Sequence, residues 1–201
     1  MMKTVLAIVA LLAAVIGNYG ITYAHCDTED GPVIKDARLA LENNNVNYVL
    51  KWVPAADEKE LKEAYDLTMK VRNLSPEAMR LADRNFFETL VRIHRSGEGV
   101  AFTGVKPAGA PIDEKILAAD RSIEEGNLKP LERYTPQSKK AEIKKRFNKV
   151  MKLKNFDVND VKAGREFVEA YVQFFHLAEG EAEEMHNKHL EGGCGHKEAH
   201  E

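Results

Sequence analysis

An amphipathic segment from Ser75 to Gly97 most constrains the fold of this chain. Ser75-Pro76-Glu77 combines a capping residue, a proline at the first helical position and an early acid, which together predict the start of a helix. Apolar residues then recur at three- to four-residue spacing as far as Ile93, and the pattern ends near Ser96-Gly97. A helix this long has to bury its apolar side against other elements, so the chain needs further layers.

The rest of the chain supplies those layers as more helices. Helical periodicity is found over residues 32–42, 57–72, 112–125 and 135–151, and from 157 or 159 to 177, with a short piece at 46–53. No alternating stretch predicts a strand, and no repeat of fixed period is present. We therefore expect an all-α, single-domain helical bundle over residues 25–190, followed by a flexible tail at 191–201 that bears cysteine and histidine.

The first 24 residues have the layout of a secretory signal peptide. Lys3 gives a basic start, Val5 to Ile16 is an unbroken apolar run, and Thr22-Tyr23-Ala24 places small residues before a cleavage point. Cleavage after Ala24 would make His25 the mature N-terminus. A lipoprotein signal, with Cys26 lipidated, would need a small residue in place of His25. The pattern predicts a secreted or periplasmic protein.

Composition excludes two classes of partner. The net charge of −3 becomes −4 once Lys3 is removed, and acids and bases are interspersed without a basic block. The sequence therefore lacks the basic patch that is typical of nucleic-acid-binding proteins. No second apolar stretch approaches membrane length, so we expect no membrane association after signal cleavage. The sequence is compatible with a homo-oligomer and does not determine the oligomeric state.

The mature N-terminus predicts a metal site. A cleaved chain offers the α-amine and imidazole of His25 together with the backbone amide nitrogen and thiolate of Cys26. Amine, deprotonated amide and thiolate form a planar donor set, which suits Ni(II) or Cu(II), and the imidazole can reach an axial position. Asp30 is a further oxygen ligand, and Gly31 lets the chain bend back. We therefore predict a nickel or copper ion held by His25, Cys26 and Asp30 within the segment 25–33.

The opening residues resemble those of a known enzyme family. His25-Cys26-Asp27 followed by Asp30-Gly31 is similar to the start of nickel-containing superoxide dismutase, HCDxxCG. The resemblance implies a small helical bundle whose processed N-terminus wraps nickel, and an oxidoreductase activity. Asp30 stands where that family has its second nickel-binding cysteine, and Val33 where it has a tyrosine. A carboxylate is a harder ligand than a thiolate, which argues against dismutation by that family's mechanism.

A second resemblance covers most of the mature chain. The opening HCDxxDGPV, the stretch FFETLVRIHRSGEG, the loop TGVKPAG and the helix VEAYVQFFH are similar to those of an uncharacterised family of exported helical proteins. This resemblance implies the helical class and export, and it brings no activity with it.

A disulfide is the alternative use of Cys26. The chain has two cysteines, Cys26 and Cys194, near its opposite ends. Disulfides persist in the compartments that exported proteins reach. The alternative function is accordingly a non-enzymatic helical binding or structural protein with a Cys26–Cys194 bond, and a Cys26 that does neither also stays open.

Other histidines and acids form two secondary metal candidates. His94 and His176 each lie among apolar residues near the end of a predicted helix, where a hydrogen-bonded structural histidine is the alternative reading. The C-terminal stretch carries a second group, in which Glu183 and His186 have i, i+3 spacing. The members of that group are Glu183, His186, His189 and Cys194.

One long loop completes the predicted organisation. Residues 97–111 are rich in glycine and proline and separate two helical patterns. Long loops inside compact domains are usually ordered for a purpose. We expect this loop to pack near the N-terminal segment or to close one end of the bundle.

Overall fold

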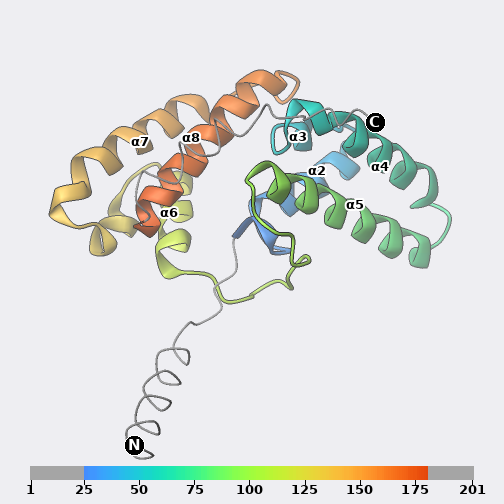
Figure 1. The fold of residues 1–201 in the computed structure, drawn as a ribbon, viewed down its shortest axis with the longest axis horizontal. Coiled ribbons are helices and arrows are strands. Elements are labelled where there is room, and N and C mark those ends of the chain that lie inside the picture. Colours follow the sequence, from blue (N-terminus) through green and yellow to red (C-terminus); the bar gives the residue numbers. More distant parts are fainter. Residues whose placement is uncertain (1–24, 181–201) are drawn as a thin grey trace, which may run out of the picture.

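Residues 25–180 are described by a computed structural model, and they form helices joined by turns and one long loop (Figure 1). Over this range no strand is formed, and a single bridge joins Thr28 to Lys106. The all-α class is therefore confirmed. The predicted signal peptide and the predicted tail lie outside the described residues.

The helices follow one another along the chain with short 3-10 turns between them. The α-helices are α2 (Pro32–Glu42), α3 (Asn47–Leu50), α4 (Glu58–Val71), α5 (Pro76–Gly97), α6 (Glu114–Glu125), α7 (Lys140–Leu153) and α8 (Val161–Glu179). The 3-10 turns are η1 (His25–Asp27), η2 (Ala55–Asp57), η3 (Lys129–Tyr134) and η4 (Gln137–Lys139). No described helix is long and apolar enough to cross a bilayer.

Local signals account for most helix ends. The Ser75 hydroxyl accepts a hydrogen bond from the amide of Ala78 at 3.1 Å, which caps α5 as its sequence predicts. Gly126 ends α6 in the left-handed region at φ 69°. The helix expected to begin at Thr135-Pro136 begins instead at Lys140, because Pro136 is extended, with ψ 147°, and a 3-10 turn follows it.

The helices form two groups (Figure 1). The first group comprises α2, α3, α4 and α5, in which α5 packs against α4 and α2. The second comprises α6, α7 and α8, in which α8 packs against both α7 and α6. The loop after α5 and the segment before α2 run between the two groups. Residues 25–28, which are buried or partly buried, therefore lie at the junction of the two groups.

The start of α8 fixes the second group to the first. The Arg165 guanidinium donates to the carbonyl of Leu50 at 3.1 Å and to the carboxylate of Glu58 at 2.7 Å. Both acceptors belong to the first group, so α8 is held across the junction. One consequence is that the ring of Tyr171, further along α8, meets the edge of Trp52 at a centroid distance of 6.0 Å.

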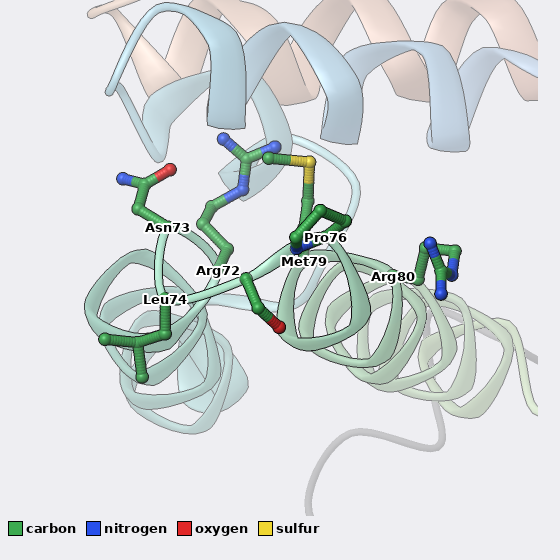
Figure 2. A pocket seen from close by; sticks show the side chains of 7 residues that line it. Arg72, Asn73, Leu74, Pro76, Met79 and Arg80 are labelled. Carbon is green, nitrogen blue, oxygen red and sulfur yellow. The ribbon is translucent and has the colours of Figure 1, made fainter.

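A surface hollow lies far from this junction, at the turn between α4 and α5 (Figure 2). Leu74 and Met79 line it, and Met79, which the sequence pattern places on the apolar side of α5, is 38 % exposed. The Arg72 guanidinium at its rim donates two hydrogen bonds to the carboxylate of Asp83, at 2.9 and 3.0 Å. No histidine or cysteine lines the hollow, so it has none of the predicted site residues.

Candidate functional site at the N-terminal turn

The N-terminal turn, residues 25–31, bends back tightly on itself. The carbonyl of His25 accepts a hydrogen bond from the Thr28 hydroxyl at 3.1 Å, and the amide of Gly31 donates to the carbonyl of Thr28 at 2.9 Å. A Cβ atom at Gly31 would lie 2.0 Å from the carbonyl oxygen of His25. Only glycine fits at this position, because the backbone of the turn occupies the space of a side chain.

The loop after α5 holds the turn in place. The Lys106 amide donates to the carbonyl of Asp27 at 2.8 Å, and the Glu29 amide donates to the carbonyl of Lys106 at 2.9 Å. The Gly109 amide donates to the carboxylate of Asp30 at 3.0 Å and, as the main cause, lowers the pKa of that carboxyl. The predicted packing of loop 97–111 against the N-terminal segment is therefore confirmed.

The His25 side chain reaches into the second helix group. Its Nδ1 lies 2.5 Å from Oδ2 of Asp120 on α6, and the other oxygen of Asp120 accepts a hydrogen bond from the Tyr171 hydroxyl at 2.8 Å. Burial is the main reason that the pKa of Tyr171 is raised well above its ordinary value, and the charge of Asp120 adds to it. The imidazole is thus placed by residues that lie about a hundred positions or more away in sequence.

Charged groups from α5 surround the other side of the turn. Arg95 donates from Nη1 to Glu98 at 2.7 Å, and its Nε lies 3.6 Å from Oδ1 of Asp27. His94 is 3 % exposed, with Nδ1 at 2.9 Å from the carbonyl of Trp52 and Nε2 at 3.4 Å from Glu98. Burial raises the pKa of Asp27, and Arg95 partly offsets this.

Cys26 interacts electrostatically with both sets of groups. It is partly buried and packs against the core. The pKa of its thiol is raised well above its ordinary value, first by burial and then by the negative charges of Glu98 and Asp27, while Arg95 opposes the shift. A thiol that keeps its proton at neutral pH is not an activated nucleophile. The surroundings of Cys26 therefore do not favour nucleophilic catalysis.

Several buried polar atoms in and next to the N-terminal turn lack a hydrogen-bond partner. Across residues 25–180, the buried side-chain nitrogen and oxygen atoms without a hydrogen-bond partner are His25 Nδ1, Asp27 Oδ1, His94 Nε2, Arg95 Nε and Asp120 Oδ2. All five take part in ion-pair contacts, His25 with Asp120 at 2.5 Å, Asp27 with Arg95 at 3.6 Å and His94 with Glu98 at 3.4 Å, but none of these contacts has the geometry of a hydrogen bond. Buried polar groups in folded proteins are normally paired, so each exception calls for an explanation, such as a bound water, an ion or local strain. We call these five residues, with Cys26, Glu98 and Tyr171, the Cys26 cluster.

The predicted primary ligands are only partly brought together. His25 and Cys26 belong to the Cys26 cluster, whereas the Asp30 carboxylate is turned to Gly109 in the loop. Among the described side chains, no three histidines, cysteines or acids are placed to hold a metal ion by themselves. A metal ion at the turn would therefore need backbone donors.

The secondary candidates are placed apart. His94 is a hydrogen-bonded core histidine inside the Cys26 cluster, whereas the His176 side chain is 48 % exposed and lies 3.7 Å from Glu179 at the end of α8. The remaining candidates lie outside the described residues. These are Glu183, His186, His189 and Cys194.

The sequence analysis did not identify the residues that other helices contribute to the Cys26 cluster. One of them, Asp120, could have been identified from its position in the sequence. Asp120 shares the buried side of α6 with Ile116 and Ile123, at i, i+4 and i, i+3 spacing. A carboxylate within an apolar stripe is costly unless it is paired, so it indicates a buried polar partner. Tyr171 carried no such signal, because an aromatic residue on an apolar helix face looks like ordinary core.

The buried thiol predicts a pH-dependent stability. Above about pH 9 the thiol of the unfolded chain loses its proton while the folded Cys26 keeps it. The folded state then binds more protons, so the free energy of unfolding falls as pH rises, by up to about 1.4 kcal/mol per pH unit. Urea unfolding of the reduced protein at several alkaline pH values should show this slope, and Cys26→Ser should remove it. Equal slopes in the two proteins would contradict the raised pKa, since Cys194 is present in both.

Comparisons with known proteins give one match. A protein family of unknown function, DUF6448, matches residues 30–177. No curated protein and no solved structure matches the chain. The matched range runs from α2 to near the end of α8 and does not include His25 and Cys26, but it includes Asp120, Tyr171 and the α5 part of the Cys26 cluster.

Proposed function

Since the chain belongs to this family of unknown function, whose name brings no activity with it, we propose from the site itself that the protein binds Cu(II) or Ni(II) at its processed N-terminus. The donors are the α-amine of His25 and the amide nitrogen and thiolate of Cys26. The observation that carries the proposal is that the buried side-chain polar atoms without a hydrogen-bond partner in residues 25–180 all belong to the N-terminal turn or to residues linked to it by ion-pair contacts. The proposal includes cleavage after Ala24, and hence a secreted or periplasmic protein.

The charge around Cys26 favours a cation. Asp27, Glu98 and Asp120 each raise the pKa of the thiol, and Arg95 is the group that lowers it. An excess of negative charge in a partly buried place destabilises a thiolate and stabilises a metal cation. A metal ion would relieve the same repulsion that keeps the thiol protonated.

The rigidity of the turn favours a chelate. The His25 carbonyl is held by Thr28, and the backbone after Cys26 is fixed by the loop, through the hydrogen bonds of Lys106 with Asp27 and Glu29. Donors held in position lose little conformational entropy when a ligand binds. The turn supplies a single thiolate, so we propose metal binding and not dismutation.

The test compares two N-termini. One protein begins at His25 and the other keeps Ala24 in front of it, so that the amine is lost as a chelating donor in the second. Adding one equivalent of Cu(II) or Ni(II) to the first should give a thiolate charge-transfer band and quench the fluorescence of Trp52, the single tryptophan of the chain, which contacts Tyr171 in the cluster. The extended protein should bind at least about tenfold more weakly, which corresponds to about 1.4 kcal/mol.

Two results would contradict the proposal. Equal binding by the two proteins would show that the amine is not a donor. A thiol count of zero in the purified mature protein, with a Cys26–Cys194 peptide in its digest, would favour the alternative of a non-enzymatic helical protein with a disulfide.

A further inference from the structure

The imidazole of His25 is in contact with Asp120, and this contact affects whether the imidazole can bind a metal ion. In a chelate that uses the α-amine, only Nδ1 of the same residue can reach the metal, because it closes a small ring, while Nε2 points away from it. Nδ1 is the atom that lies 2.5 Å from Asp120. A metal held by the amine therefore competes with Asp120 for this nitrogen.

Asp120 is itself held in place. Its second oxygen accepts a hydrogen bond from Tyr171 at 2.8 Å, and Tyr171 stacks on Phe175 at a centroid distance of 4.2 Å and meets the edge of Trp52. Asp120 Oδ2 and His25 Nδ1 are both buried, and neither has a hydrogen-bond partner among the described residues. Each atom therefore depends on the other for electrostatic compensation, so separating them is unfavourable.

From this geometry we infer that Asp120 and Tyr171 are positioning residues that withhold the His25 imidazole from the metal. The inference rests on the proposed metal site. The bound ion then keeps the amine, the Cys26 amide and the Cys26 thiolate as its donors from the turn. With Asp30 turned to Gly109, a further coordination position is left to a small ligand from solution.

The experiment uses the full mature chain, loaded under argon with less than one equivalent of Cu(II). Electron spin echo measurements detect the remote nitrogen of a coordinated imidazole. The wild-type protein should lack this signal. Asp120→Ala should show it, and Asp120→Ala combined with His25→Ala should lose it again, which assigns the signal to His25 rather than to another histidine. Tyr171→Phe should give a partial signal, because Asp120 loses its anchor.

Matched variants control for simple damage to the fold. Asp83 is a carboxylate that accepts hydrogen bonds from Arg72, at 2.9 and 3.0 Å, and the Tyr65 hydroxyl donates to Ala40 and Asn44. Asp83→Ala and Tyr65→Phe should leave the spectrum without an imidazole signal. A signal in either would attribute the effect to general loosening and overturn the inference.

The remaining outcomes separate the two proposals. A His25 imidazole signal in the wild-type protein, or none in Asp120→Ala, would overturn the inference while leaving the metal site intact. Failure of the wild-type protein and of every variant to bind Cu(II) at the N-terminus would instead remove the proposed function, and the inference with it.

Discussion

Replacing Cys26 by serine is expected to abolish the thiolate charge-transfer band of the copper- or nickel-loaded protein. Serine keeps the size and the backbone amide, but its hydroxyl does not ionise in the relevant pH range and is a much poorer ligand for these ions. We expect the affinity to fall by at least a hundredfold, about 2.7 kcal/mol. Titration followed by absorption and by Trp52 fluorescence measures both changes.

The matched control for this prediction is Cys194→Ser. It removes the other cysteine of the chain, so the band should persist with unchanged intensity. If the band instead survives Cys26→Ser and disappears with Cys194→Ser, the metal is held by the C-terminal residues and the proposed site is wrong. The effect on the band of replacing His186 and His189 by alanine then distinguishes a site made only of C-terminal residues from a site shared between the two ends of the chain.

The substitution Gly31→Ala is expected to open the N-terminal turn. The new methyl group would lie 2.0 Å from the carbonyl oxygen of His25, a backbone atom that cannot rotate away. The turn must unfold locally and lose its hydrogen bonds to Thr28 and Lys106. We expect a loss of about 2–3 kcal/mol in the free energy of unfolding, as in other cases of overpacking, together with weaker metal binding.

Gly104→Ala is the matched control. This glycine lies in the loop that contacts the turn and has φ 90°, but nothing lies within 4 Å of the added carbon. It should cost only about 1 kcal/mol, from backbone strain, and leave metal binding unchanged. Urea unfolding and Trp52 quenching compare the two variants. If Gly31→Ala behaves like Gly104→Ala, the turn is not required for the site.

Local sequence signals predicted the helices well. Ser75 with Pro76, and Gly126 with its left-handed backbone, act within a few residues, so their effect can be seen without the rest of the fold. The region 129–139 was harder to predict, because its prolines are compatible with a helix start and with a 3-10 turn. Tertiary packing decides between them, and here α7 begins after the second turn.

Of the candidate site, only the residues of the N-terminal turn could be predicted from the sequence. The chemistry of His25 and Cys26 follows from their order in the chain, and the glycine-rich loop indicated its own place against them. The partners Asp120, Arg95 and Tyr171 come from helices whose relative placement no local pattern encodes. The orientation of Asp30 could not be predicted either, because its carboxylate accepts a hydrogen bond from the backbone amide of Gly109 in a loop that is distant in sequence.

The place of the N-terminal turn between the two helix groups has a consequence for the order of folding. The contacts of His25 with Asp120, and of Asp120 with Tyr171, join positions that are far apart in the chain, and such contacts form late because the intervening chain must first be ordered. Each helix group alone lacks part of the Cys26 cluster. The proposed site would then be complete only in molecules whose two halves have docked, so metal uptake would act as a check on finished folding.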